Sequence, residues 1–350
     1  MDDKTKTTAK REQIPYLHFL RACAILFVIM LHSYTPYFTD AANYDTRTWF
    51  AMLFINAFSR AGVPLFFMMS GYLLMSDKKS LDVGNFYKKR LPRIIIPLVI
   101  YSTVFYVYDC ISGAQTFGVF DFLSKLFSAH NGGMRYHLWY LYTLIGFYLV
   151  TPFLKRIVDN CTRKQLWTFQ IVVMFFTAIM PVIHLTTPVY VYFFDPLFNG
   201  YMGYFIFGYV LGTADTDNKY APLAGIAMIA AGFSLSFFGN HVYSSAEGIN
   251  PVFNGGYYLN HYLIAGGIFI LAKRFYKKGA PAVNKIFALI SEASFVMYFV
   301  HTTVLDAVSG LTAGLSPALG ILVYFFSASI LSALAGIIVT RIKFLKGFLY

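Results

Sequence analysis

The sequence predicts an all-α membrane protein of about ten transmembrane helices, and three observations support this fold class. Hydrophobic residues make up 57% of the 350 positions and charged residues only 13%, whereas soluble domains carry about 25% charged residues. The mean hydropathy is +0.58. Apolar runs close to the ~20 residues that cross a bilayer recur along the whole chain. This composition excludes a disordered chain, a nucleic-acid-binding domain and most soluble enzymes.

Ten apolar runs divide the chain, and each is long enough, or nearly so, to form one membrane span. The runs cover residues 16–38, 51–75, 94–110, 137–154, 166–183, 197–213, 221–238, 257–272, 286–306 and 317–340. The third and sixth runs are short. Residues 184–200 form a candidate re-entrant segment, because Pro188 and Pro196 interrupt them.

We expect one integral-membrane domain over residues 1–350, because the runs leave room only for short loops. A tail over residues 1–13 precedes a transmembrane core over 14–340, and a second tail covers 341–350. The first run has no small-residue cleavage site, so we interpret it as a retained span rather than a signal peptide. The three cysteines match no disulfide or zinc spacing.

The basic residues lie almost entirely on one side of this topology. Of the 28 Lys and Arg residues, all but five fall in the tails or in loops on the same side as the tails. Arg47, Lys125 and Arg135 lie on the opposite side, and Arg21 and Arg60 lie inside runs. Cytoplasmic loops of membrane proteins are rich in Lys and Arg. We therefore expect both termini in the cytoplasm, where part of the +12 net charge can also bind lipid headgroups or a phosphorylated ligand.

Ionisable side chains inside the runs are the first candidates for function, because a charge is costly to place in a bilayer. Arg21 and His32 are eleven residues apart, so they project from one helix face roughly 16 Å apart along the axis. This arrangement suits a long ligand with a phosphate at one end and reactive chemistry at the other. The alternative is an arginine that reaches the headgroups and a core histidine bonded to another helix.

Arg60 lies in the middle of the second run, just before Gly62 and Pro64. A buried arginine needs an anionic partner, carbonyl groups or a water-filled cavity. Gly62 and Pro64 loosen a helix and can free carbonyls for this purpose. The alternative is a structural kink with a buried ion pair to Glu292 or another acid.

Two short patterns follow Arg60 along the chain. Ser70 and Gly71 are small and permit close approach of a ligand or a helix, although ordinary membrane packing explains them equally well. Arg90 and Arg93 lie three apart at the start of a helix, which suits phosphate binding by guanidinium groups and free N–H groups. The alternative for the arginine pair is a membrane-surface anchor.

Two aromatic and histidine groups lie later in the chain. His137, Trp139 and Tyr140 open the fourth run from the outer side, where aromatic-belt anchors are the alternative interpretation. Tyr298 and His301 lie three apart and share a helix face. The remaining histidines have no metal-ligand spacing, and we assign no metal site.

Taken together, these residues resemble the acyltransferase-3 family of integral membrane acyltransferases. That family is marked by Arg/Lys-x10-His in the first span, Phe-Phe-x-x-Ser-Gly in the second and Arg-x-x-Arg before the third. Arg21 and His32 match the first motif, Phe66-Phe-Met-Met-Ser-Gly71 the second, and Arg90 and Arg93 the third.

The resemblance covers nearly the whole chain, about residues 14–340. Residues 59–73, 137–141, 148–152 and 289–301 look most like the enterobacterial common antigen O-acetyltransferase branch. The resemblance implies a bacterial inner-membrane enzyme that takes an acetyl group from cytoplasmic acetyl-CoA, without a permanently bound cofactor. The implied acceptor is a hydroxyl on a lipid-linked or cell-surface glycan.

The resemblance also assigns roles to the candidate residues. His32 would be the general base on the acceptor hydroxyl, or alternatively a transient acyl carrier. Arg60 would stabilise the oxyanion or hold a neighbouring acid. Arg21 completes the catalytic set and is a further candidate for the donor phosphates. The donor set is Arg90, Arg93, Ser70 and Gly71. The acceptor set is His137, Trp139, Tyr140, Tyr298 and His301.

The alternative function is a transporter or flippase for a lipid-linked sugar or a small anion. Buried arginine and histidine side chains would then line a translocation pathway. Many transporters carry internal repeats, and the sequence shows none. Consumption of acetyl-CoA by the purified protein distinguishes the two functions.

Overall fold

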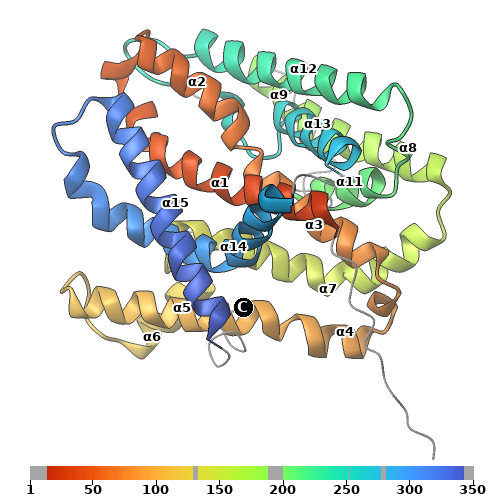
Figure 1. The fold of residues 1–350 in the computed structure, drawn as a ribbon, viewed down its shortest axis with the longest axis horizontal. Helices are drawn as coiled ribbons and strands as arrows, with labels where there is room; N and C mark the ends of the chain where they lie inside the picture. Colours follow the sequence, from red (N-terminus) through yellow and green to blue (C-terminus); the bar gives the residue numbers. More distant parts are fainter. Residues whose placement is uncertain (1–13, 129–132, 188–199, 251, 277–280, 343–350) are drawn as a thin grey trace, which may run out of the picture.

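The computed structural model describes residues 14–128, 133–187, 200–250, 252–276 and 281–342 (Figure 1). Over these residues the chain is helical, and its only β feature is an isolated bridge between Ser245 and Gly248. The predicted all-α class is therefore confirmed for the described part of the chain.

The α-helices follow one another with short connections. They are α1 (Pro15–Phe38), α2 (Arg47–Ser59), α3 (Gly62–Ser76), α4 (Val83–Arg90), α5 (Pro92–Ile111), α6 (Val119–Phe127), α7 (Trp139–Asp159), α8 (Arg163–Met174), α9 (Met180–Thr186), α11 (Met202–Gly212), α12 (Ala221–Val242), α13 (Leu259–Phe275), α14 (Pro281–Val308) and α15 (Pro317–Arg341).

Eight segments of the described chain are long and apolar enough to cross a membrane, where the sequence predicted ten. The sixth and eighth predicted runs correspond to α11 and α13, which have 11 and 17 residues. Nearly every residue of α11 is buried among other helices, so its apolar character reflects its position in the protein interior. The candidate re-entrant segment at 184–200 lies largely outside the described residues.

The second and fifth runs are interrupted helices, and a break also precedes the third. The second run breaks at Arg60 and Ala61, between α2 and α3. The third run lies within α5, which begins at Pro92 because proline has no N–H to continue α4. The fifth contains a π-helical turn over Phe175–Ile179 between α8 and α9. Residues on the two sides of a break can face different neighbours.

Helix α1 lies at the centre of the bundle, where it contacts α2, α3, α14 and α15 (Figure 1). Helices α12 and α13 pack side by side at one edge, and α4, α5 and α6 lie at the opposite edge. The outward face of α15 exposes Leu322, Phe326, Ile330, Leu334 and Ile338. Their spacing of four residues forms one apolar stripe, as expected for a helix that faces lipid.

The closest helix contact joins α3 to α11 through glycines. A Cβ atom at Gly71 would lie 1.7 Å from the carbonyl oxygen of Phe205, and one at Gly208 would lie 1.9 Å from that of Met68. Any larger side chain at either position would therefore overlap backbone. Small residues at such crossings let helix backbones touch. The van der Waals contact between the backbones then stabilises helix association, because lipid provides no hydrophobic driving force for it.

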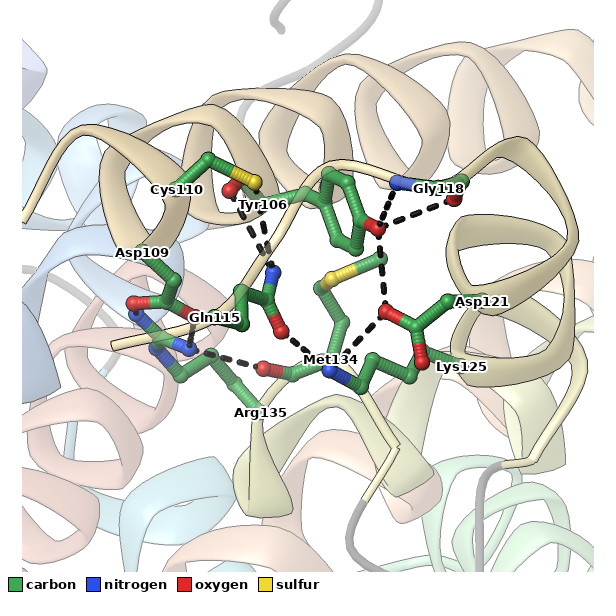
Figure 2. A network of polar contacts seen from close by, with 9 residues as sticks. All are labelled: Tyr106, Asp109, Cys110, Gln115, Gly118, Asp121, Lys125, Met134 and Arg135. Atoms are coloured by element: carbon green, nitrogen blue, oxygen red, sulfur yellow. Dashed lines mark hydrogen bonds and ion pairs between the residues drawn. The ribbon is translucent and has the colours of Figure 1, made fainter. Parts of the chain in front are cut away.

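Helix α6 is amphipathic, and its polar side is tied to α5 (Figure 2). The Tyr106 hydroxyl accepts a hydrogen bond from the Gly118 N–H at 3.0 Å and donates to Asp121 at 2.9 Å. Lys125 forms an ion pair with Asp121 at 3.1 Å. The bonds from Tyr106 and Lys125 lower the pKa of the Asp121 carboxyl. The opposite face of α6 leaves Phe120 and Phe127 exposed.

Candidate active site

A cavity of about 320 Å³ lies between α1, α3, α5, α7 and α14. Its lining residues are Arg21, Phe66, Ser70, Arg93, Ile94, Tyr140, Leu144, Tyr148, Ser291, Ser294, Phe295 and Tyr298. Four predicted site residues from four different helices thus meet in one space, namely Arg21, Ser70, Arg93 and Tyr140. Tyr298 from α14 is the fifth.

The cavity carries two guanidinium groups. Within the described part of the chain, neither Arg21 nor Arg93 forms an ion pair with a carboxylate. Arg21 Nη1 lies 3.5 Å from Ser291 Oγ, and His18 Nδ1 lies 3.0 Å from the same oxygen. Arg93 is exposed, so the cavity reaches the protein surface at this end. The two positive charges remain available for an anionic ligand.

The two arginines of the predicted phosphate pair occupy different places. Arg93 lines the cavity, whereas Arg90 pairs with Asp77 at 3.2 Å in a neighbouring pocket that also contains Lys79 and Lys89. The break at Leu91 directs the two side chains to separate surfaces.

The small residues of the second motif also separate. Ser70 lines the cavity, and Gly71 faces α11. The structure therefore gives Gly71 a packing role.

Three histidines from distant parts of the sequence form a cluster. His32 comes from α1, His137 from the short helix Tyr136–Leu138, and His301 from α14. The ring of His301 lies 5.2 Å, centroid to centroid, from that of His32 and also 5.2 Å from that of His137. His137 and His301 are buried. Tyr136 joins the cluster, since its hydroxyl lies 3.4 Å from His32 Nδ1. Within the described chain, no group of His, Cys, Asp or Glu side chains is placed to hold a metal ion.

The segment that carries Tyr136 and His137 is fastened to α5 by an ion pair (Figure 2). Arg135 donates two hydrogen bonds to the carboxylate of Asp109, at 2.6 and 2.7 Å. A bidentate pair of this kind fixes orientation as well as distance. It therefore holds the chain directly before His137 in one place.

Tyr298 lies between the cavity and the histidine cluster. Its side chain lines the cavity, its hydroxyl donates to the backbone carbonyl of His137, and its ring lies 5.4 Å from the His137 ring. Tyr140 packs against it at 5.5 Å. His32 is not among the cavity's lining residues. The cavity that contains Arg21 therefore does not reach His32 directly, and Tyr298 contacts both the cavity and the cluster.

Trp139 and Tyr140 face different surroundings although they are adjacent in sequence. Tyr140 is buried in the cavity wall, whereas Trp139 packs against Tyr201 at 4.9 Å. Of the two, only Tyr140 therefore lines the cavity.

Arg60 is held by neutral groups. Its Nε donates to Asn56 Oδ1 at 2.8 Å, and its Nη1 donates to the Asn254 carbonyl at 2.9 Å. Asn56 in turn donates to the Asn254 side chain at 2.8 Å. Glu292 is exposed, so the alternative of a buried ion pair between it and Arg60 is wrong. The guanidinium keeps its full charge because amide oxygens orient it without neutralising it.

Several site residues escaped the sequence analysis, notably Tyr136, Tyr148, Ser291 and Ser294. A signal for two of them is present in the sequence. Ser291 and Ser294 continue the Tyr298 and His301 pattern at spacings of three and four residues, which is one polar stripe along a helix in an otherwise apolar run. Tyr136 and Tyr148 carry no such signal, because aromatic residues are abundant throughout the chain.

The comparison with protein families agrees with this geometry. An acyltransferase-domain family model matches residues 14–341, nearly the whole chain. The chain therefore belongs to the acyltransferase-3 family, as the resemblance implied, and is a multi-pass membrane acyltransferase by family and fold. No curated protein and no solved structure matches it.

Proposed function

We propose that this protein is an O-acetyltransferase of the bacterial inner membrane, related to the enterobacterial common antigen branch of its family. It transfers an acetyl group from cytoplasmic acetyl-CoA to a hydroxyl of a lipid-linked or cell-surface sugar. The observation that supports the proposal is that Tyr298 lines a cavity with two guanidinium groups and also contacts His137 of the histidine cluster.

The cavity suits the acyl end of the donor. Its volume of about 320 Å³ lies at the small end for ligand pockets, which favours a slender acyl-pantetheine arm over a nucleotide. Arg93 at the open end and Arg21 inside supply charge for phosphate groups. The adjacent pocket adds Lys79, Lys89 and Arg90 beside Asp77 and Asp82, and Lys79 and Lys89 would contact the nucleotide phosphates while Arg90 stays paired with Asp77.

The transfer step uses the histidine cluster. His32 takes the proton of the acceptor hydroxyl while its oxygen attacks the thioester carbonyl carbon. The new C–O bond forms, the C–S bond breaks, and the CoA thiolate leaves and takes up a proton. Arg60 supports the negative charge on the carbonyl oxygen in the transition state. Tyr298 must swing aside for the thioester to meet His32, and in its closed position it keeps water from the donor.

The test is transfer of radiolabelled acetyl from acetyl-CoA into membrane glycan. Membranes contain wild type, His32→Ala or the control His241→Ala at matched protein levels. His241 packs on Tyr44 and Phe50, away from the cluster. We expect labelled glycan with wild type and His241→Ala but not with His32→Ala. Substantial transfer by His32→Ala would exclude its role as base. Absence of acetyl-CoA consumption by any variant in the presence of acceptor membranes would contradict the function itself.

A further inference from the structure

His301 has a feature that its place in the acceptor set does not explain. Its Nδ1 lies 2.8 Å from the carbonyl oxygen of Tyr298 and 3.2 Å from that of Met297. Carbonyl oxygens only accept hydrogen bonds, so Nδ1 of the neutral ring carries the hydrogen. Its Nε2 is then an unprotonated acceptor. The helix backbone of α14 thus fixes the tautomer of this histidine.

The Nε2 atom of His301 is buried and has no hydrogen-bond partner among the residues that the structure describes. The whole residue is 0% exposed. A buried acceptor without a partner is costly in a stable fold and calls for an explanation such as a catalytic role. A donor therefore reaches this nitrogen during the reaction. Its nearest ring neighbours are His32 and His137, both at 5.2 Å.

His32 is the neighbour that can supply this donor in the reaction. Centroids 5.2 Å apart place two imidazoles in the range where an N–H of one ring can bond to a nitrogen of the other. His32 gains a proton when it deprotonates the acceptor hydroxyl, and the resulting imidazolium has donors at both nitrogens. One of them faces the hydroxyl, and the other needs an acceptor inside the protein.

We propose that His301 is the positioning residue of His32, and that its Nε2 accepts the second N–H of the His32 imidazolium. This inference rests on the proposed acetyl transfer. The hydroxyl proton moves to one nitrogen of His32, and the hydrogen already on the other nitrogen is then donated to His301 Nε2, which lacks a partner before the reaction. When the thiolate leaves, His32 returns the first proton to it, and both histidines are neutral again. His301 thereby orients His32 and stabilises its imidazolium, as a buried carboxylate does for the histidine of a serine-protease triad.

Two conservative substitutions separate this role from simple packing. An asparagine at position 301 can keep a donor near the place of Nδ1 but has nothing at the place of Nε2. A glutamine reaches the place of Nε2 with an amide oxygen that accepts hydrogen bonds. We expect His301→Asn to lower kcat roughly 100-fold, and His301→Gln to keep kcat within about tenfold of wild type. KM for acetyl-CoA stays unchanged in both, because the donor cavity lies beyond Tyr298.

The assay is steady-state acetyl transfer into acceptor membranes, with His241→Asn as the matched histidine control. Equal kcat for His301→Asn and wild type would overturn the proposal. Equal loss in the Asn and Gln variants, with both folded by size-exclusion chromatography, would assign His301 a packing role and overturn it as well. The wild-type rate separates the proposed acetyl transfer from the proposed role of His301. An inactive wild-type protein contradicts the acetyl transfer, whereas an active wild type with an unaffected His301→Asn variant contradicts only the role of His301.

Discussion

At the scale of single residues, the site combines charges that have no counter-ion with polar groups that orient them. Arg60 is bonded to an asparagine side chain and a backbone carbonyl. A carboxylate in their place would cancel the positive potential that an oxyanion needs, whereas amide oxygens hold the group still without cancelling it. The same logic applies to Arg21, whose neighbours are the hydroxyl of Ser291 and, beyond it, His18.

Tyr298 supports the first residue-scale prediction. Because Tyr298 lines the donor cavity and also packs against His137 of the histidine cluster, we expect Tyr298→Ala to open a path for water to the thioester. We expect acetyl-CoA hydrolysis without acceptor to rise on the order of tenfold. The measurement is release of free CoA thiol by the purified protein in detergent.

Tyr148→Ala is the control, because Tyr148 also lines the cavity but does not contact the cluster. It enlarges the cavity and leaves the partition in place, so hydrolysis should stay at the wild-type level. Hydrolysis that is unchanged in Tyr298→Ala, or raised equally by both substitutions, would show that Tyr298 is not the barrier.

At the scale of helices, the positions of the site residues depend on breaks and close crossings. Arg90 at the end of α4 and Arg93 in the first turn of α5 lie in different pockets. The crossing of α3 and α11 at Gly71 holds α3 so that Ser70, its neighbour, faces the cavity. Ser70 and Gly71 are adjacent in one motif, but Gly71 packs against α11 and Ser70 faces the cavity.

The helix-scale prediction concerns this crossing. Gly71→Ala would place a Cβ atom 1.7 Å from the Phe205 carbonyl oxygen, so α3 and α11 must move apart. Overpacking of this kind costs roughly 1–3 kcal/mol. We expect a lower Tm in detergent, measured by the unfolding of purified protein.

Gly146→Ala in α7 is the matched control, because a Cβ atom at Gly146 meets nothing within 4 Å. Alanine favours helix more than glycine does, so this variant should be neutral or slightly more stable. Similar Tm values for Gly71→Ala and wild type would mean that the crossing is looser than the structure shows.

At the scale of the whole molecule, the chain forms one helical bundle around α1. The uneven placement of Lys and Arg predicts that the loop between α7 and α8 faces the cytoplasm. Cys161 lies in that loop and is partly exposed. Its thiol can therefore be labelled to determine the orientation of the protein in the membrane, and no further cysteine is needed for this loop. The Ser245 region between α12 and α13 lies at the other end of this topology.

The corresponding prediction uses a membrane-impermeant maleimide. Cys161 should react only after cells are permeabilised, whereas a Ser245→Cys variant in a Cys161→Ser background should react in intact cells. The Cys161→Ser protein without further change is the control for background labelling. Labelling of Cys161 in intact cells would reverse the predicted orientation and would place the Arg93 end of the cavity away from cytoplasmic acetyl-CoA.

Properties that depend on composition and on spacing within one helix could be predicted from the sequence. Apolar runs of about 20 residues form helices in a bilayer, because a helix satisfies every backbone N–H and C=O within the segment. Arg21 and His32 lie on α1 at a fixed separation because helix geometry alone sets it. The order of the three motifs also identified the family that the family comparison shows.

How residues on different helices meet depends on the tertiary structure. It brings His32, His137 and His301 together, separates Arg90 from Arg93, and puts Tyr298 in contact with both the cavity and the cluster. It also shows that the apolar residues of α11 are buried among other helices. These facts depend on packing between distant segments, and helix periodicity contains no information about which faces of two helices touch.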